Sequence, residues 1–142
     1  MGNKHEVLNE FMVDCFYSIL RDEEQALESL SNGKLSLKEI HVIEAVFKTQ
    51  KTNSNTFSNI ANMLRVKLGT LTESFSKLEK KGYLTKEQDK IDKRVYYIVP
   101  TRLGEMINTE HTKWHQELIA NVVKTIPEDD IPIFIDGMKN LC

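Results

Sequence analysis

Cysteine, proline and glycine are scarce in this sequence, and long apolar runs are missing. Two cysteines, Cys15 and Cys142, are too few for a disulfide framework, so we expect a reduced, cytoplasmic compartment. Three prolines and six glycines accompany a chain with no repeat and no low-complexity tract. No run reaches the roughly 20 apolar residues of a membrane-spanning helix, and the N-terminus lacks a secretory segment, so we expect no membrane association.

The sequence motifs of common enzymes are also missing. There is no P-loop, no G-x-G-x-x-G, no nucleophile elbow and no H-E-x-x-H. Hydrophobic residues make up 40% and charged residues 28% of the chain, which is typical of a soluble globular protein with one core. We therefore expect one domain over residues 1–142 that is not an enzyme and requires no cofactor.

The charge of the chain is unevenly distributed. Nine Lys or Arg and five Asp or Glu lie between Met63 and Arg94, a local charge of +4, whereas the whole chain carries −2. The remainder therefore carries −6. A basic segment within an acidic protein is typical of a local nucleic-acid surface, although an excess of four also fits ordinary solvation.

Apolar pairs recur every four residues near the N-terminus. They run from Val7 to Leu20 and predict a long helix over residues 5–31 that ends at Asn32-Gly33. A helix with so broad an apolar face needs a partner surface, either in the core of its own domain or in a second subunit.

The next segment carries strong helix-start signals. Ser36 and Glu39 form a capping box, S-x-x-E, for a second helix. The polar stretch that follows is turn-like, and Thr52 to Ser54 fit a short strand. Asn55 or Thr56 then caps a short third helix.

The stretch from Leu64 to Gly82 reads as an amphipathic helix, with Arg65 to Lys67 as the turn that leads into it. One face is an apolar stripe, and the other is small, hydroxylated and basic. Gly82 is typical of a helix C-terminus. Two short helices joined by a brief turn, the second with a polar basic face, indicate a helix-turn-helix.

After Gly82 the period of the sequence changes. Tyr83 to Thr85 and Arg94 to Val99 are rich in residues that favour strands, and the segment between them is highly charged. This pattern predicts a hairpin with a long polar tip. A hairpin directly after a helix-turn-helix is a wing, and the combination favours DNA binding.

Two helices are predicted beyond the wing. Pro100-Thr101 closes the second strand and starts a long helix over residues 101–125. Thr125 and Glu128 form a T-x-x-E box for a last helix over residues 127–141, with a kink or restart at Pro132.

This order of elements resembles the MarR family of winged-helix regulators over essentially the whole chain. The matching motifs are L-T-x-S-x-x-x-L-E-K-K-G-Y-L from Leu71 to Leu84, D-x-x-D-x-R from Asp89 to Arg94, and P-T-x-x-G from Pro100 to Gly104. The resemblance implies a mainly α fold with a small β wing, a DNA-binding lobe over residues 36–99 and a homodimer. The terminal helices of two subunits would interlock, and two recognition helices would bind a pseudo-palindromic operator in double-stranded DNA.

Candidate DNA contacts follow from the polar helix face and from the family pattern. They are Lys67, Gly69, Thr70, Thr72, Ser76, Lys77, Lys90, Lys93 and Arg94. Arg94 pairing with Asp92 to shape the wing is an equally open alternative. The family often has an arginine in the middle of the wing tip, where this chain has Ile91, so minor-groove contact would fall to the lysines or be weaker.

Within the family, the chain looks most similar to repressors of fatty-acid synthesis. That resemblance implies an acyl chain, presented on acyl carrier protein, as an effector that changes DNA affinity. The expected cleft lies between the second helix and the helix after the wing, walled by Val42, Val46 and Ile107.

A second set of residues resembles the zinc site of the family's metal sensors. His111 and His115 lie four apart on one predicted helix, a common metal-ligand spacing, with His41 and Glu23 on earlier helices. A possible zinc site competes with the interpretation that these are polar residues at the edge of a ligand cleft. A further alternative to DNA binding is a winged-helix module for protein interaction, against which the charged wing and helix face argue.

Overall fold

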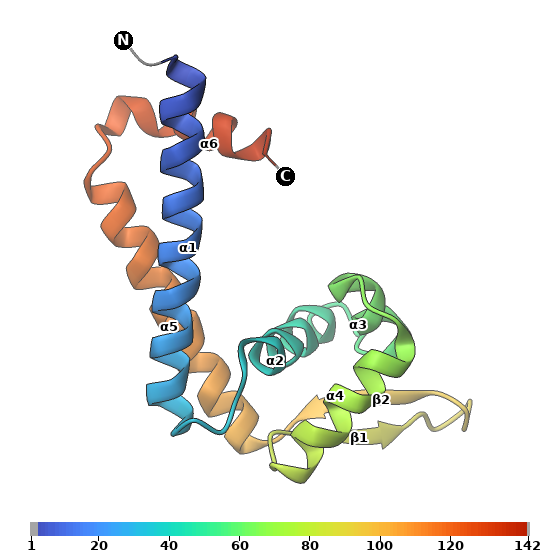
Figure 1. Ribbon diagram of the computed structural model, residues 1–142. Coiled ribbons are helices and arrows are strands. Elements are labelled where there is room, and N and C mark those ends of the chain that lie inside the picture. Colours follow the sequence, from blue (N-terminus) through green and yellow to red (C-terminus); the bar gives the residue numbers. More distant parts are fainter. Residues whose placement is uncertain (1–2, 142) are drawn as a thin grey trace. The chain divides into compact units, whose positions relative to one another are not determined.

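The computed structural model describes residues 3–141 and divides into two compact units, one running to Thr109 and the other starting at Glu110. Its elements, in chain order (Figure 1), are α1 (Lys4–Ser31), α2 (Leu37–Gln50), α3 (Phe57–Leu64), α4 (Leu68–Lys80), β1 (Leu84–Gln88), β2 (Tyr96–Pro100), α5 (Arg102–Lys124), the 3₁₀ turn η1 (Glu128–Asp130) and α6 (Ile131–Lys139). The predicted fold class, mainly α with a small β wing, is confirmed.

The predicted ends of α1 and α2 are confirmed by their hydrogen bonds. Asn32 ends α1 in a left-handed conformation with φ 52°, and the N–H of Gly33 donates to Glu28. At the start of α2 the Oγ of Ser36 accepts the N–H of Glu39 at 3.2 Å, and the Glu39 carboxylate accepts the N–H of Ser36 at 2.9 Å. Both halves of the capping box are therefore formed.

The helix-turn-helix consists of α3 and α4. Thr56 caps α3 by accepting the N–H of Asn59, and Arg65 closes the helix with φ 55°. The next helix begins at Leu68, after the predicted turn, and Gly82 follows its end with φ 85°. A left-handed residue at each of these ends lets the chain reverse over few residues, which fixes where α4 starts and stops.

The core of the first unit fills the space between α2, the helix-turn-helix and the sheet. The predicted apolar stripe of α4 (Leu71, Phe75 and Leu78) is buried, and the Phe57 and Phe75 rings meet edge to face at 5.0 Å. The remaining buried apolar residues include Leu27, Leu35, Ile40, Val42, Ile43, Ala45, Val46, Ile60, Ala61, Tyr83, Leu84, Ile98 and Ile107. Because one face of α4 is used for packing, its other face remains available to a partner.

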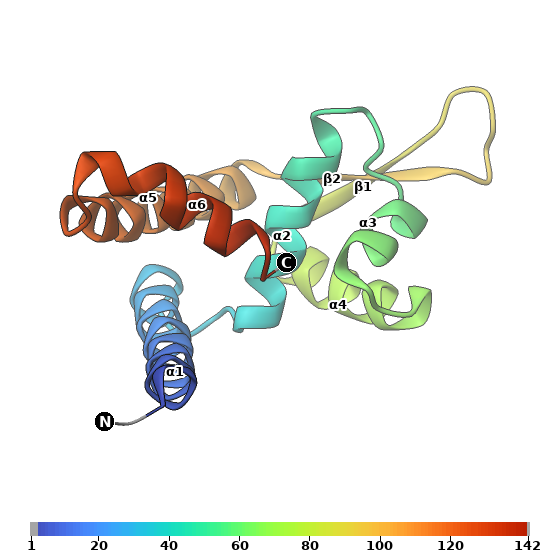
Figure 2. The ribbon, with the colours of Figure 1, turned by 90° about the horizontal axis from the view of Figure 1, so that it is seen from above.

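The wing is an antiparallel pair of strands, with Leu84 opposite Pro100 and Gln88 opposite Tyr96. The predicted hairpin is confirmed, but the bounds of its strands differ. The first strand continues through polar residues to Gln88, and the second starts at Tyr96 because Val95 still belongs to the turn, its N–H donating to the carbonyl of Asp92. Figure 2 shows the loop of this hairpin extending beyond α3 and α4.

The predicted strand from Thr52 to Ser54 is wrong. The hydroxyls of both residues bond to the carbonyl of Thr49 and to each other, which closes a turn after α2. The pairing with the wing occurs instead at an isolated bridge between Thr56 and Tyr97.

The start of α5 is fixed closely against the end of α4. The hydroxyl of Thr101 donates to the carbonyl of Gly82 and accepts the N–H of Gly104, while the N–H of Thr101 donates to the carbonyl of Tyr83. A side chain at position 104 would collide with that Tyr83 carbonyl. Glycine in the P-T-x-x-G motif therefore permits this close approach.

In the second unit, the predicted restart near Pro132 is confirmed. The turn η1 precedes α6. Pro132 lies in the first turn of α6, where the missing backbone N–H of proline costs little. The predicted T-x-x-E box is not formed, because the Thr125 hydroxyl donates back to the carbonyl of Val122. No helix within residues 3–141 is long and apolar enough to cross a membrane.

Candidate nucleic-acid interface

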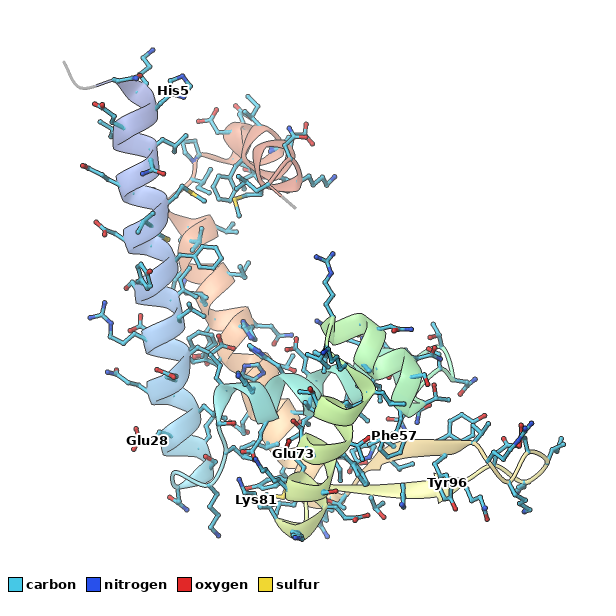
Figure 3. All side chains as sticks on the ribbon, turned by 45° about the vertical axis from the view of Figure 1, so that its right-hand side comes forward. His5, Glu28, Phe57, Glu73, Lys81 and Tyr96 are labelled. Carbon is cyan, nitrogen blue, oxygen red and sulfur yellow. The ribbon has the colours of Figure 1, made fainter. Side chains whose placement is uncertain are left out.

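The face of α4 that points away from the core carries the sequence-predicted contacts. It is exposed along its length and presents Gly69 and Thr70 in its first turn and Ser76 and Lys77 about two turns later, with Lys67 at the N-cap. Gly69 has open space around it, so nothing on the protein prevents a close approach there. Figure 3 shows the labelled Glu73 on α4 and Lys81 at its end. Such a face can supply hydroxyl and amine donors to phosphates and base edges.

Two of these candidates have internal partners. The ammonium of Lys77 lies 3.4 Å from the carboxylate of Glu73, one turn earlier, and both side chains are well exposed. An exposed pair of this kind is weak and can be exchanged for a phosphate. The hydroxyl of Thr72 donates to the carbonyl of Leu68 at 2.9 Å and still faces solvent.

Lys81 contributes to the positive charge of this segment, but its ammonium is held by partners within the protein. Its Nζ donates to both carboxylate oxygens of Glu39, at 2.8 and 2.9 Å, and to the carbonyl of Lys34 at 2.7 Å. Burial raises the pKa of Glu39, but the hydrogen bonds from Lys81 and from the N–H of Ser36 outweigh it, so the pKa lies below its ordinary value. Lys81 therefore joins the end of α4 to the start of α2.

The turn of the wing is built around Asp89. Its Oδ2 accepts the N–H groups of Ile91 and Asp92, at 2.9 and 2.8 Å, and its Oδ1 accepts the hydroxyl of Tyr97 at 3.1 Å. The N–H groups of Asp92 and Ile91 lower the pKa of Asp89, and the same carboxylate raises the pKa of Tyr97. The carboxylate thus orders the tip. The D-x-x-D-x-R motif was the available signal for this role, which the sequence reasoning did not assign.

Basic side chains surround this turn. Lys90 and Lys93 are exposed, whereas Arg94 pairs with Asp92 through Nε and Nη2 at 3.1 and 3.2 Å. The hydrogen bond from the Arg94 side chain is the main reason that the pKa of Asp92 is lowered. The alternative role for Arg94, shaping the wing, is therefore formed, while its side chain remains 91% exposed and open to a phosphate.

Sequence reasoning also missed the aromatic side of the wing. The ammonium of Lys86 lies 5.0 Å from the centre of the Tyr96 ring, and the amide of Gln88 donates to the Tyr96 hydroxyl and to the carbonyl of Lys93. Figure 3 shows Tyr96 on the wing and Phe57 at α3. No local motif announces these contacts, because they depend on the pairing of β1 with β2.

A pocket of about 390 Å³ lies between the two parts of this surface. It brings Thr72 of α4 together with Arg94 of the wing, which the sequence had placed on separate elements. Its other lining residues are Thr56, Phe57, Ser58, Leu68, Val95 and Tyr96. Hydroxyls and a guanidinium around a hollow suit an anionic group.

The remaining sequence candidates are located as follows. The proposed cleft walls Val42, Val46 and Ile107 are buried in the core of the first unit. In that unit the Nε2 of His41 lies 3.4 Å from the buried carboxylate of Glu23. In the second unit the His111 and His115 rings meet edge to face on α5, with centres 4.4 Å apart. Cys15 is a free, half-buried thiol, and Cys142 lies outside the described residues.

Comparisons with known proteins agree with this geometry. The family described as "Transcriptional regulator SarA/Rot" matches residues 27–107, more than half of the chain. The transcriptional regulator AdcR of Streptococcus pyogenes serotype M6 is 28% identical over 89 residues, which are 63% of this chain. That match spans 58% of the relative's own length.

Solved structures share the fold. FabT from Streptococcus pneumoniae, solved in complex with DNA, is 29% identical, with a TM-score of 0.88 over 97% of this chain and 94% of that one. The G34K mutant of S. aureus MepR is 16% identical, with a TM-score of 0.74 over 94% of each chain. The predicted winged-helix regulator fold is confirmed by these matches.

Proposed function

Because the chain belongs to the SarA/Rot family of transcriptional regulators, we propose that it is a repressor. It is a DNA-binding regulator of winged-helix type and not an enzyme. It binds a pseudo-palindromic operator as a homodimer, with α4 in the major groove. The observation that carries the proposal is the exposed face of α4, where Thr70, Ser76 and Lys77 lie opposite a fully packed apolar stripe.

The test of this proposal is selection of bound duplexes from a random pool. We expect an enriched site with twofold symmetry and half-sites about one helical turn apart, roughly 34–36 Å. Affinity for that site falls steeply as salt rises, because bound lysines release counterions from DNA. A protein-interaction module without DNA binding gives no enriched duplex and no such salt dependence, and that result refutes the proposal.

The dimer is part of the proposal, and its support is apolar surface. On α1 the side chains of Val7, Leu8, Phe11, Phe16 and Tyr17 are each exposed by more than half. Exposed apolar residues on α6 are Ile133, Phe134, Ile135 and Met138. Monomeric soluble proteins rarely expose so many large apolar side chains on single helices, so a second copy of the chain is the proposed cover.

For the effector we propose an acyl chain carried by acyl carrier protein, on the strength of the resemblance to repressors of fatty-acid synthesis. The proposed walls of its cleft, Val42, Val46 and Ile107, are buried in the core, so the ligand must open a space between them. Titrating operator binding with long-chain acyl donors tests this. Unchanged DNA affinity at saturating donor excludes it.

Zinc is the second candidate effector. Support is the proximity of His41 to the buried Glu23 carboxylate, and of His111 to His115 within the second unit. Nitrogen and carboxylate ligands of this kind suit zinc. The test is to expose the parent and His111→Ala to zinc, dialyse both and measure their metal content. Stoichiometric zinc in the parent that is lost in the variant supports the zinc site. A parent that stays metal-free excludes it.

A further inference from the structure

The tip of the wing presents an aliphatic side chain to solvent. Ile91 is 95% exposed, the highest exposed fraction among the large apolar side chains of residues 3–141. Most other exposed apolar side chains lie on helices such as α1 and α6, whereas Ile91 lies among charged neighbours at the end of a hairpin. Burying an isoleucine gains free energy, so a partner that covers this tip gains affinity from it.

The backbone under Ile91 is held in one conformation. The Asp89 carboxylate accepts the N–H of Ile91, and the Asp89 N–H and Val95 N–H close the turn by donating to the carbonyls of Val95 and Asp92. Gln88 adds a hydrogen bond to the carbonyl of Lys93. Because the loop is already ordered, binding through its tip loses little conformational entropy.

The charge around Ile91 indicates what the partner is. Lys90 precedes it and Lys93 follows two residues later, and both ammonium groups are exposed. An apolar side chain between two cations matches a nucleic-acid groove, which has phosphates along both edges and apolar sugar walls between them. Proteins that bind the minor groove frequently insert apolar side chains, isoleucine and leucine among them, between its base steps.

The wing also has the length to reach a minor groove. The chain from Leu84, beside the end of α4, to Ile91 extends roughly 20 Å at about 3.3 Å per residue. The groove next to the one that α4 enters lies half a helical turn away, about 17 Å along the duplex. The hairpin loop extends beyond α4 (Figure 2), so both elements can contact one duplex together.

We propose that Ile91 enters the minor groove of the operator and packs against its sugars and base edges, while Lys90 and Lys93 contact the phosphates on either side. The proposal rests on the proposed DNA-binding function. It adds a source of sequence preference: a G·C pair displays the guanine amino group in this groove, and an isoleucine packed over that donor would strip its water without replacing the hydrogen bond. Ile91 therefore favours A·T pairs beneath the wing.

The experiment uses the full chain and its selected operator, with Ile91→Ser, Ile91→Leu and Ile91→Arg. Ile91→Ser weakens binding by about tenfold without changing the salt slope, because an apolar contact releases no counterion. Ile91→Leu binds within about twofold of the parent, because it keeps the apolar surface. Ile91→Arg steepens the salt slope by about one, because it adds a charge near phosphates. Since the side chain is 95% exposed and contributes little to packing, the melting temperature of all three stays close to the parent value.

A second measurement reads the base preference directly. Replacing A·T pairs beneath the wing by G·C pairs should weaken operator binding by the parent but not by Ile91→Ser. Hypoxanthine in place of guanine should restore binding by the parent, because hypoxanthine lacks only the minor-groove amino group. The inference is overturned if Ile91→Ser binds as tightly as the parent, or if hypoxanthine and guanine sites bind the parent equally. If the parent selects no duplex at all, the proposed function itself fails.

Discussion

The ammonium of Lys81 lies 2.8 Å from one oxygen of Glu39 and 2.9 Å from the other, and this pair joins the last residues of the helix-turn-helix to the first turn of α2. The Glu39 side chain is only 10% exposed. Its carboxylate also caps α2 by accepting the N–H of Ser36. One side chain therefore holds the start of a core helix and the end of the recognition helix.

Removing the cation should destabilise the fold and misplace α4. Lys81→Met leaves a nearly buried carboxylate without its ammonium, at a cost of about 1–3 kcal/mol in the free energy of unfolding. Denaturant titration measures this, with Lys80→Met as the control because Lys80 is exposed one residue earlier. A double-mutant cycle with Glu39→Gln isolates the pair. Equal stability of Lys81→Met and the control would contradict the assignment.

The same pair predicts a pH dependence of stability. Because the pKa of Glu39 is lowered in the folded chain, the ion pair contributes fully above about pH 4.3, the ordinary value of an unfolded glutamate. Its contribution is lost as the pH falls from there through the lower folded-state pKa. Unfolding experiments at pH 7 and in this acidic range should therefore show a smaller acid loss for Glu39→Gln than for the parent. Parallel curves would mean that Glu39 keeps its ordinary pKa.

What the sequence predicted well was local. The Ser36 and Glu39 box, the left-handed Asn32 and the glycine at 82 each depend on residues within a few positions of one another, so their motifs were sufficient. The pairing of Glu39 with Lys81 links residues 42 positions apart, and no periodicity announces it.

The local errors have local competitors. The Thr125 hydroxyl donates to the carbonyl of Val122, about one turn earlier, so the predicted capping box with Glu128 did not form.

The part of the candidate site on α4 was predictable, because one face of that helix is recognisably polar in the sequence. The pocket that joins Thr72 to Arg94 was not, because it depends on how the wing folds back beside the helix.

Gly104 should not tolerate a side chain. A Cβ at this position would collide with the carbonyl of Tyr83, which also accepts the N–H of Thr101. We expect Gly104→Ala to lower the free energy of unfolding by about 1–3 kcal/mol, because the start of α5 must move away from the end of α4. Gly69→Ala is the matched control: it lies in open helix and should gain up to about 1 kcal/mol. A free energy of unfolding equal to the parent's for Gly104→Ala would show that the junction between Tyr83 and α5 can accommodate a side chain.

Charge on the exposed face of α4 should control DNA affinity. Lys77→Ala is expected to weaken operator binding and lower the salt slope by about one, because it removes a phosphate contact. Glu73→Ala should strengthen operator binding, since it removes an acidic group and releases Lys77 from its partner at 3.4 Å. Thr70→Ala should weaken binding by about 1–3 kcal/mol if its hydroxyl reads a base. Lys113→Ala, which breaks the similar exposed pair with Glu110, is the control. Identical affinities for Lys77→Ala, Thr70→Ala and the parent would mean that DNA binds elsewhere.

Phe11 and Phe16 provide the test of assembly. Both rings are more than 60% exposed on α1 of the single chain, where water contact is unfavourable for so large an apolar surface. If a second copy covers them, a charge at either position must be buried without a partner, so Phe11→Asp and Phe16→Asp should dissociate the dimer. Mass measurement in solution at micromolar concentration should give a dimer for the parent and a monomer or unfolded chain for each variant. Ile91→Ser, which changes an even more exposed apolar residue on the wing, should remain dimeric. A parent that is a folded monomer under these conditions would remove the proposed dimer, and with it the expectation of a twofold-symmetric operator.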